Sequence, residues 1–289
     1  MSATIIDGKQ IAKETRDDIK REVDSLIEQG YQPGLAVILI GEDPGSMSYV
    51  KAKAKACEEA GIFSEVIRKP ETTTQEELLD LIEALNTNDR IHGILVQLPL
   101  PKHINEDAVI HSIRPDKDVD GFHPINVGNM MIGTDCYLPC TPHGIIEMIK
   151  RTGTTIAGKH AVVVGRSNIV GKPVSILLLG ESATVSICHS KTKDLGEITR
   201  QADILIVAVG RPHLIGKEHI KPGAVVIDVG VNRIEQDGKK KLVGDVRFDE
   251  ASEVASFLTP VPGGVGPMTI TMLLKNTVDA CKKLNGLNV

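Results

Sequence analysis

The sequence predicts an α/β protein with two domains, because its length, strand pattern and helix pattern all indicate that class. The chain has 289 residues, and a domain commonly has about 150. Short β-branched runs alternate with segments of helical spacing along most of the chain. Runs that are apolar at consecutive positions are typical of parallel strands covered by helices on both faces.

The first half of the chain predicts strands joined by helices. Strands are expected at 35–40, 63–67 and 94–98, and helices at 46–60 and 74–85. Ser46 is the expected cap of the first helix, and Thr74 with Glu77 forms a capping box at the start of the second.

The second half repeats this pattern, with strands expected at 160–164, 184–187, 204–209 and 224–229. A long helix is expected over 269–284, and loops rich in proline, glycine or aspartate at 99–101, 114–133, 139–144 and 259–267. We place the domain boundary within 139–151. Residues 1–140, completed by a helix within 267–289, form the first expected domain, and residues 141–266 form the second.

Charge and composition argue against several function classes. The chain carries 33 Lys and Arg against 38 Asp and Glu, a net charge of −5, whereas nucleic-acid-binding proteins have a basic excess. It has three Tyr, four Phe and no Trp, too few aromatic rings for a surface that stacks single-stranded bases. No apolar run approaches the roughly 20 residues that span a bilayer. We therefore expect neither a nucleic-acid nor a membrane partner.

The first residues and the cysteines predict a cytoplasmic location. Asp7 and Lys9 stand where a signal peptide would have its apolar run. The five cysteines are few and odd in number, which fits reduced thiols better than a disulfide framework.

Residues 162–173, VVVGRSNIVGKP, are a candidate phosphate-binding turn. A buried strand ends at Gly165 and a helix is expected to open near Ile169, and glycine at such a turn lets backbone N–H groups approach a phosphate. The match to G-x-G-x-x-G is imperfect, and Pro173 stands where a Walker loop has Ser or Thr. The alternative is a surface turn with two glycines.

The end of the next strand favours NADP over NAD. An NAD site usually has an acidic residue about 20 residues past the glycines, where it holds the ribose diol. Here the strand runs into 188–192, CHSKT, which contains no acid. Ser190, Lys191 and nearby Arg166 suit a 2′-phosphate instead. The alternative is a polar turn that binds nothing.

Lys53 is a candidate catalytic residue. At about 100° per residue, Tyr49 and Lys53 are i,i+4 neighbours on one face of the expected helix, whereas Lys51 and Lys55 lie on another. Lys53 is flanked by Ala52, Ala56 and Ala60, on what should be the inward face. Burial disfavours a charged amine, which suits proton transfer. The alternative is a lysine whose stem packs while its amine reaches water.

Two loops could face this helix, and neither predicts a metal site. The strand within 92–101 delivers Gln97 to its carboxyl end, the usual ligand side of an α/β sheet. Residues 116–128, DKDVDGFHPINVG, hold three carboxylates, but these do not occupy EF-hand positions. Cys136, Cys140 and His143 lack the spacing of a zinc site. We expect no metal.

Taken together, these segments resemble the bifunctional methylenetetrahydrofolate dehydrogenase/methenyltetrahydrofolate cyclohydrolase family. The resemblance covers nearly the whole chain. Its most specific parts are KDVDG at 117–121 and TPVPGGVGPMT at 259–269. It is carried further by YVKAKAKACEEAGI, GILVQLPLP, PDKDVDGFHPINVG, PCTPHG, VVVGRSNIVGKPV, CHSKT, VVIDVGVN and GDV.

The resemblance implies a fold and a set of site residues. The fold is a Rossmann-like NADP-binding domain plus an α/β catalytic domain with a cleft between them, usually paired as a homodimer. The implied residues form three groups: catalytic Tyr49, Lys53, Gln97 and Asp120; dinucleotide-binding Gly165, Arg166, Ser167, Ser190 and Asn232; and folate-side Pro262, Gly263, Gly264 and Gly266, with Tyr49 and Asp120 also on the substrate.

The resemblance also implies two consecutive reactions. The first oxidises 5,10-methylenetetrahydrofolate with NADP, and the second hydrolyses the methenyl product to 10-formyltetrahydrofolate, a one-carbon donor for purine biosynthesis. Two alternatives remain at this point. One is a dehydrogenase of the same architecture for another small substrate, such as a shikimate- or amino-acid-type enzyme. The other is a non-catalytic nucleotide-binding module.

Overall fold

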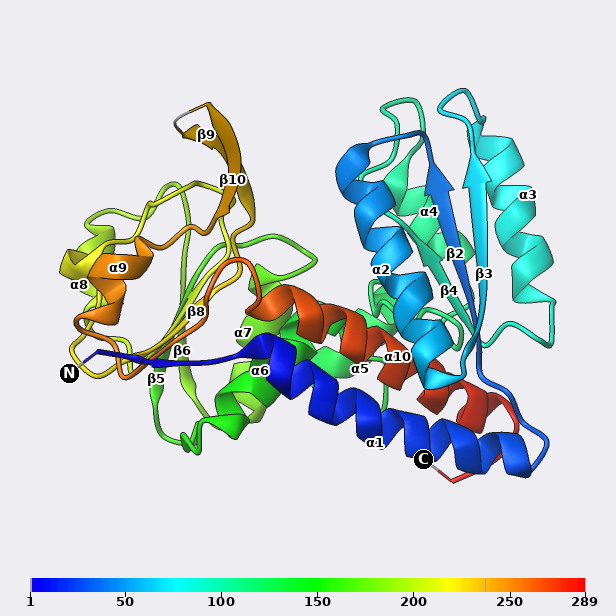
Figure 1. Ribbon diagram of the computed structural model, residues 1–289, viewed down its shortest axis with the longest axis horizontal. Helices are drawn as coiled ribbons and strands as arrows, with labels where there is room; N and C mark the ends of the chain where they lie inside the picture. Colours follow the sequence, from blue (N-terminus) through cyan, green and yellow to red (C-terminus); the bar gives the residue numbers. More distant parts are fainter. Residues whose placement is uncertain (1, 237, 289) are drawn as a thin grey trace. The chain divides into compact units, whose positions relative to one another are not determined.

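A computed structural model describes residues 2–236 and 238–288 (Figure 1). The chain divides into two compact units. One, the six-stranded unit, combines the residues up to Lys13 with Thr141–Thr269; the other, the three-stranded unit, combines Glu14–Cys140 with the residues from Ile270 onward. Each contains a parallel sheet with helices, which confirms the predicted α/β class.

The elements up to residue 132 follow one another in the order β1 (Thr4–Ile5), α1 (Gly8–Glu28), β2 (Gly34–Ile40), α2 (Pro44–Ala60), β3 (Phe63–Lys69), α3 (Gln75–Asn86), β4 (Gly93–Val96), α4 (Glu106–Ser112) and α5 (Pro124–Ile132).

The later elements are α6 (Cys140–Arg151), β5 (His160–Val164), α7 (Gly171–Gly180), β6 (Thr184–Cys188), α8 (Leu195–Thr199), β7 (Ile204–Val207), the 3₁₀ helix η1 (Lys217–His219), β8 (Val225–Asp228), β9 (Asn232–Gln236), β10 (Lys239–Val243), α9 (Phe248–Ser252), β11 (Phe257–Leu258) and α10 (Val265–Leu284).

The three-stranded sheet has the order β3-β2-β4, and both pairings are parallel. Because successive side chains of a strand point to opposite faces, Ala36, Ile38 and Ile40 of the fully buried β2 pack on one face, with apolar residues of α3 and α4. Figure 1 shows α2 and α3 on opposite sides of β2 and β3. Covering both faces explains why β2 is apolar at every position after Gly34.

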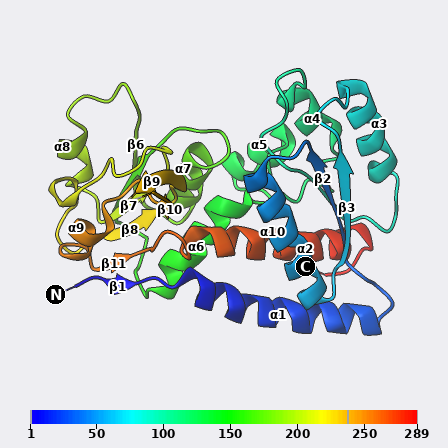
Figure 2. The ribbon, with the colours of Figure 1, turned by 45° about the horizontal axis from the view of Figure 1, so that its top comes forward.

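The six-stranded sheet has the order β1-β11-β8-β7-β5-β6 and is parallel throughout. The first strand of the chain thus pairs with the last, which Figure 2 shows. Val162, Leu205 and Val226 belong to the core on one face of the sheet, together with partly buried residues of α8. The carboxyl ends of β5, β7 and β8 therefore meet at one edge, as a ligand site in such a sheet requires.

Several predicted boundaries were wrong. Ser46 is a buried residue inside α2, and the N-cap is Asp43, whose carboxylate accepts the Ser46 N–H (2.8 Å), because Pro44 already occupies the first turn. The loop expected at 114–133 contains α5, which His123 caps through the Ile125 N–H. The capping box at Thr74 is confirmed.

The last helix begins at Val265, a turn earlier than expected. Its buried Asn276 donates hydrogen bonds from Nδ2 to the backbone oxygens of Val119 and Leu138, both at 2.9 Å. These bonds fix the helix against the part of the three-stranded unit that contains the predicted catalytic residues.

No helix among the described residues is long and apolar enough to cross a membrane. The five cysteines, all of which the structure describes, are free thiols.

Candidate active site

The α2 helix places its three neighbouring lysines in different surroundings. Lys53 is 6% exposed, whereas Lys51 and Lys55 are exposed to solvent, as their spacing predicts. Ala56 is also buried beside Lys53, but Ala52 is exposed, contrary to expectation. At 100° per residue Ala52 falls outside the buried arc, whose centre lies near Lys53.

The Lys53 amine is held by the side chain of Gln97. Lys53 Nζ donates to Gln97 Oε1 at 3.0 Å, and Gln97 Nε2 donates to the Leu98 backbone oxygen at 2.7 Å. Gln97 follows β4 directly, and its own backbone N–H donates to Ile38 of β2. Both ends of the Gln97 amide are therefore used, and the sheet fixes the position of the amine.

Asp120 lies within electrostatic reach of Lys53. Desolvation raises the pKa of the Asp120 carboxyl, while the nearby Lys53 charge and a hydrogen bond with Cys140 act in the opposite direction. Asp120 also lines a small cavity of about 20 Å³ whose wall is mostly apolar. A carboxyl group that can accept hydrogen bonds is therefore available near the lysine.

Asp118 shapes the loop that carries Asp120. Its buried carboxylate accepts the backbone N–H groups of Phe122 (3.3 Å) and His123 (2.8 Å) and Nδ2 of Asn126 (2.8 Å). Burial raises its pKa to about 6. Sequence analysis did not single out Asp118 within KDVDG, because nothing in the pattern showed which carboxylate turns inward.

Tyr49 lies one helical turn before Lys53 and is 40% exposed. In the three-stranded unit the structure therefore joins Lys53 to Gln97 directly, sets Asp120 close enough to influence the lysine electrostatically, and leaves the Tyr49 ring accessible. Their catalytic roles stay a prediction.

The predicted phosphate-binding turn lies at the carboxyl end of β5. Gly165 has φ +141°, and a methyl group on it would overlap the Ala208 backbone oxygen, so only glycine fits between β5 and β7. The Ser167 hydroxyl accepts the N–H groups of Val170 and Gly171 (both 3.2 Å) at the start of α7. Arg166 is exposed beside them.

The turn after β6 carries no carboxylate. Its shape is fixed internally: the His189 N–H donates to the Thr192 hydroxyl (2.9 Å), and the Lys191 N–H donates to His189 Nδ1 (3.1 Å). Ser190 and Lys191 are exposed on this turn. Strands β5 and β6 are paired in parallel, with Val164 opposite Cys188. Ser190 and Lys191 therefore follow the strand next to the one that ends before Gly165.

The remaining predicted residues lie in two other segments of the six-stranded unit. Asn232 begins β9 and is half-buried. The folate-side group, at the start of α10, has Pro262 exposed, Gly264 buried, and Gly263 and Gly266 half-buried. These roles also stay a prediction.

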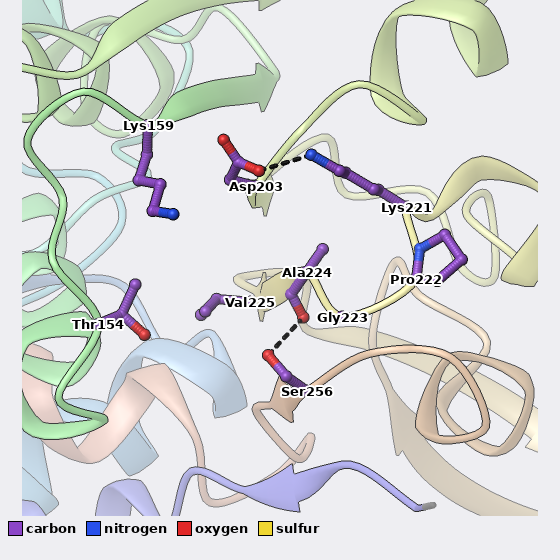
Figure 3. A pocket seen from close by; sticks show the side chains of 9 residues that line it. All are labelled: Thr154, Lys159, Asp203, Lys221, Pro222, Gly223, Ala224, Val225 and Ser256. Atoms are coloured by element: carbon purple, nitrogen blue, oxygen red, sulfur yellow. Dashed lines mark hydrogen bonds and ion pairs between the residues drawn. The ribbon is translucent and has the colours of Figure 1, made fainter.

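One hollow of the six-stranded unit lies away from these residues. It measures about 130 Å³ and is lined by residues that precede strands, among them Lys159, Asp203 and Ala224 (Figure 3). The Lys221 amine already pairs with Asp203 at 2.7 Å. The hollow lies at the amino ends of these strands, whereas Gly165 follows the carboxyl end of β5, so the hollow is not the predicted cofactor site.

The described residues contain no group of three or more His, Cys, Asp or Glu side chains placed to hold a metal ion. Asp116, one of the three carboxylates considered for calcium, pairs with Arg114 instead.

Comparisons with known proteins match both halves of the chain. Residues 6–120 match the tetrahydrofolate dehydrogenase/cyclohydrolase catalytic domain, and residues 139–285 match the NAD(P)-binding domain of the same family. The bifunctional protein FolD of Brevibacillus brevis is 67% identical over 98% of this chain and 99% of its own.

Solved structures agree with these matches. The bifunctional FolD methylenetetrahydrofolate dehydrogenase/cyclohydrolase of Campylobacter jejuni matches with TM-score 0.95 and 52% identity over 98% of this chain and all of its own. The Trypanosoma brucei FolD, solved with NADP cofactor and inhibitor, matches with TM-score 0.95 and 41% identity over 99% of both chains.

The raised pKa of Asp118 predicts a pH-dependent stability. Between its ordinary value of 3.8 and about 6, the folded chain holds a proton that the unfolded chain has lost, so stability falls as pH rises through this window. This pKa difference corresponds to about 3 kcal/mol in the free energy of unfolding. Urea unfolding from pH 4 to 7 should show the free energy of unfolding of the parent falling by roughly this amount relative to that of Asp118→Asn.

Asp80→Asn, at an exposed position, is the control and should follow the parent. If the free energy of unfolding of Asp118→Asn changed with pH as that of the parent does, the raised pKa of Asp118 would be contradicted.

Proposed function

Because this chain belongs to the tetrahydrofolate dehydrogenase/cyclohydrolase family, we propose that Lys53, held by Gln97, is the acid–base group with which it processes the folate substrate. The enzyme oxidises 5,10-methylenetetrahydrofolate with NADP and hydrolyses the methenyl product to 10-formyltetrahydrofolate. The observation that supports Lys53 is its buried amine, fixed by a hydrogen bond of 3.0 Å at the carboxyl end of β4. The family assignment sets aside the two other functions considered.

The six-stranded unit fits NADP. The turn between Gly165 and the start of α7 would take a phosphate, and the β6 turn presents Ser190 and Lys191 but no carboxylate to a 2′-phosphate. Arg166, Ser167 and Asn232 complete the set that would hold it. NADP supplies a hydride acceptor when bound. We assign residues 141–266 to cofactor binding, and residues 1–140 with 267–289 to catalysis and folate binding.

The two reactions make different demands on the chain. In the oxidation no proton has to move, so the protein chiefly orients the reactants. In the hydrolysis, water adds to the methenyl carbon and one carbon–nitrogen bond of the ring breaks. Both protons of the water are lost as the formyl group forms: one reaches the departing ring nitrogen and the other is released to solvent, which removes the charge of the methenyl cation. Lys53 Nζ takes a proton from the water and delivers one to the ring nitrogen, and such a group contributes roughly 10²–10⁴ in rate.

Three further groups position the folate. The Asp120 carboxylate accepts hydrogen bonds from pterin N–H groups. The accessible Tyr49 ring stacks on the pterin or donates a hydrogen bond near Lys53. The turn of Pro262, Gly263, Gly264 and Gly266 contacts the substrate through its backbone. These roles follow the resemblance, and the exposure of Tyr49 and Pro262 leaves both accessible to a ligand.

We further propose that the enzyme is a homodimer in the cytoplasm and that its product serves purine biosynthesis. Five free thiols suit a reducing compartment. The six-stranded sheet ends on β6, whose Ile187 is 45% exposed, an edge that a second copy would cover. Light scattering that gives the mass of one chain would contradict the dimer.

Lys53→Met should separate the two reactions. Methenyl hydrolysis should fall by roughly 10²–10⁴, because the proton-transferring group is gone. Part of the oxidation should survive, with the methenyl product released. The measurement is methenyl absorbance, followed with methylene substrate plus NADP and with methenyl substrate alone.

Lys51→Met and Lys55→Met are matched controls, since both lysines are exposed on the same helix. They should keep both activities near the parent level. Hydrolysis at the parent rate by Lys53→Met, or equal losses in all three variants, would refute the role of Lys53.

Arg166→Ala should reduce the preference for NADP. Losing a charge-assisted contact to the 2′-phosphate should raise the Michaelis constant for NADP about tenfold or more, and that for NAD much less. Arg200→Ala, which removes an exposed arginine just after α8, is the control and should change neither constant. Equal increases for NADP and NAD in Arg166→Ala would exclude the 2′-phosphate role.

A further inference from the structure

Asp245 is the centre of a hydrogen-bonded cluster that the roles assigned above do not include. Its side chain is 0% exposed. Oδ2 accepts the backbone N–H groups of Val209 (2.7 Å) and Gly210 (2.9 Å), and Oδ1 accepts Nδ2 of Asn232 (2.9 Å). One carboxylate therefore ties the turn after β7 to the first residue of β9.

A second buried carboxylate fixes Asp245 in place. Asp228, at the end of β8, accepts the backbone N–H groups of Asp245 and Val246 (both 2.9 Å) and of Gly230 (3.0 Å). A methyl group on Gly244 would overlap the Asp228 carboxylate, so the chain comes as close as glycine allows. The position of Asp245 is therefore set by Asp228 and does not depend on Asn232. The Asn232 side chain takes the orientation that the fixed Asp245 carboxylate requires.

This arrangement selects one orientation of the Asn232 amide. A carboxylate only accepts hydrogen bonds, so the amide must turn its N–H₂ group toward Asp245. The Val243 backbone oxygen lies on the same side, 3.4 Å from Nδ2. Oδ1 of Asn232 is consequently directed away from the cluster, where it can accept a hydrogen bond from a ligand.

We propose that Asp245 is a positioning residue for the dinucleotide: it holds Asn232 so that Oδ1 faces the cofactor as an acceptor, and fixes the turn at Val209 and Gly210 beside it. This inference rests on the proposed function, which assigns Asn232 to cofactor binding. It adds the reason why that asparagine is oriented, and a residue that acts through it without contacting the cofactor.

Two variants test the proposal from opposite sides. In Asp245→Asn, the one remaining oxygen is needed by the Val209 and Gly210 N–H groups, so an N–H₂ group meets Asn232 and turns its amide over. Asn232→Gln leaves Asp245 untouched and keeps the amide chemistry, but moves the amide outward by one CH₂ group. Each should raise the Michaelis constant for NADP about tenfold, the effect of one charge-assisted hydrogen bond.

Methenyl hydrolysis without NADP is the internal reference. Its proposed acid–base group, Lys53, lies in the three-stranded unit, and the proposed folate contacts include neither Asp245 nor Asn232. Both variants should therefore hydrolyse methenyl substrate within about twofold of the parent, whereas general unfolding would remove both activities. Asp249→Asn makes the same chemical change at an exposed position of α9 and should keep the parent constant for NADP.

The outcomes are distinct. A raised constant for NADP with intact hydrolysis in both variants supports the proposal. A parent constant for NADP in either variant overturns it, and if Asp245→Asn fails to fold, a parent constant in Asn232→Gln still does so. An inactive parent enzyme would instead refute the proposed function itself.

Discussion

The burial of the Lys53 amine is the constraint from which the arrangement of the three-stranded unit follows. An amine removed from water needs a hydrogen-bond acceptor, and Gln97 supplies one at 3.0 Å. That acceptor is available because β4 ends just before Gln97 and is paired in register with β2. Helix α2, two strands and a single amide thus determine the position of the amine that we propose for proton transfer.

In the six-stranded unit the buried groups are carboxylates, which need hydrogen-bond donors where the Lys53 amine needs an acceptor. Asp228 and Asp245 are buried, and each accepts three hydrogen bonds, most of them from backbone N–H groups. Burial raises the pKa of Asp228 to about 7, a cost that the three N–H groups partly offset. In both units a polar side chain at the carboxyl end of a strand, Gln97 after β4 and Asp228 in β8, forms hydrogen bonds with backbone that has left the sheet.

The sequence predicted the parts of the site that depend on local periodicity. Lys53 could be distinguished from Lys51 and Lys55 because helix geometry assigns them to different faces. Gln97 and Gly165 could be placed because each directly follows an apolar run. The strand registers, by contrast, required tertiary structure, as did the pairing of β1 with β11 across most of the chain.

Two kinds of feature could not be predicted from the sequence. One depends on contacts between residues far apart in the chain, and the other on segments in which apolar and charged residues are mixed. Asp245 acts on Val209, 36 residues earlier, and no local signal in GDV indicates this. Helix α1 was missed although Ile19 and Val23 are buried, because charged residues surround that narrow apolar stripe. Asp43 replaced Ser46 as the cap of α2 because Pro44 sets the first turn.

The most direct test of the central claim is the rate at which Gln97→Glu hydrolyses methenyltetrahydrofolate without NADP. A glutamate carboxylate at this position would hold the Lys53 amine in an ion pair, so the amine would no longer be available to take a proton from the attacking water. The rate should fall by at least about 10², and NADP affinity should stay unchanged because Gln97 lies outside the six-stranded unit. Hydrolysis by Gln97→Glu at the parent rate would contradict the role of the Gln97-held Lys53 amine.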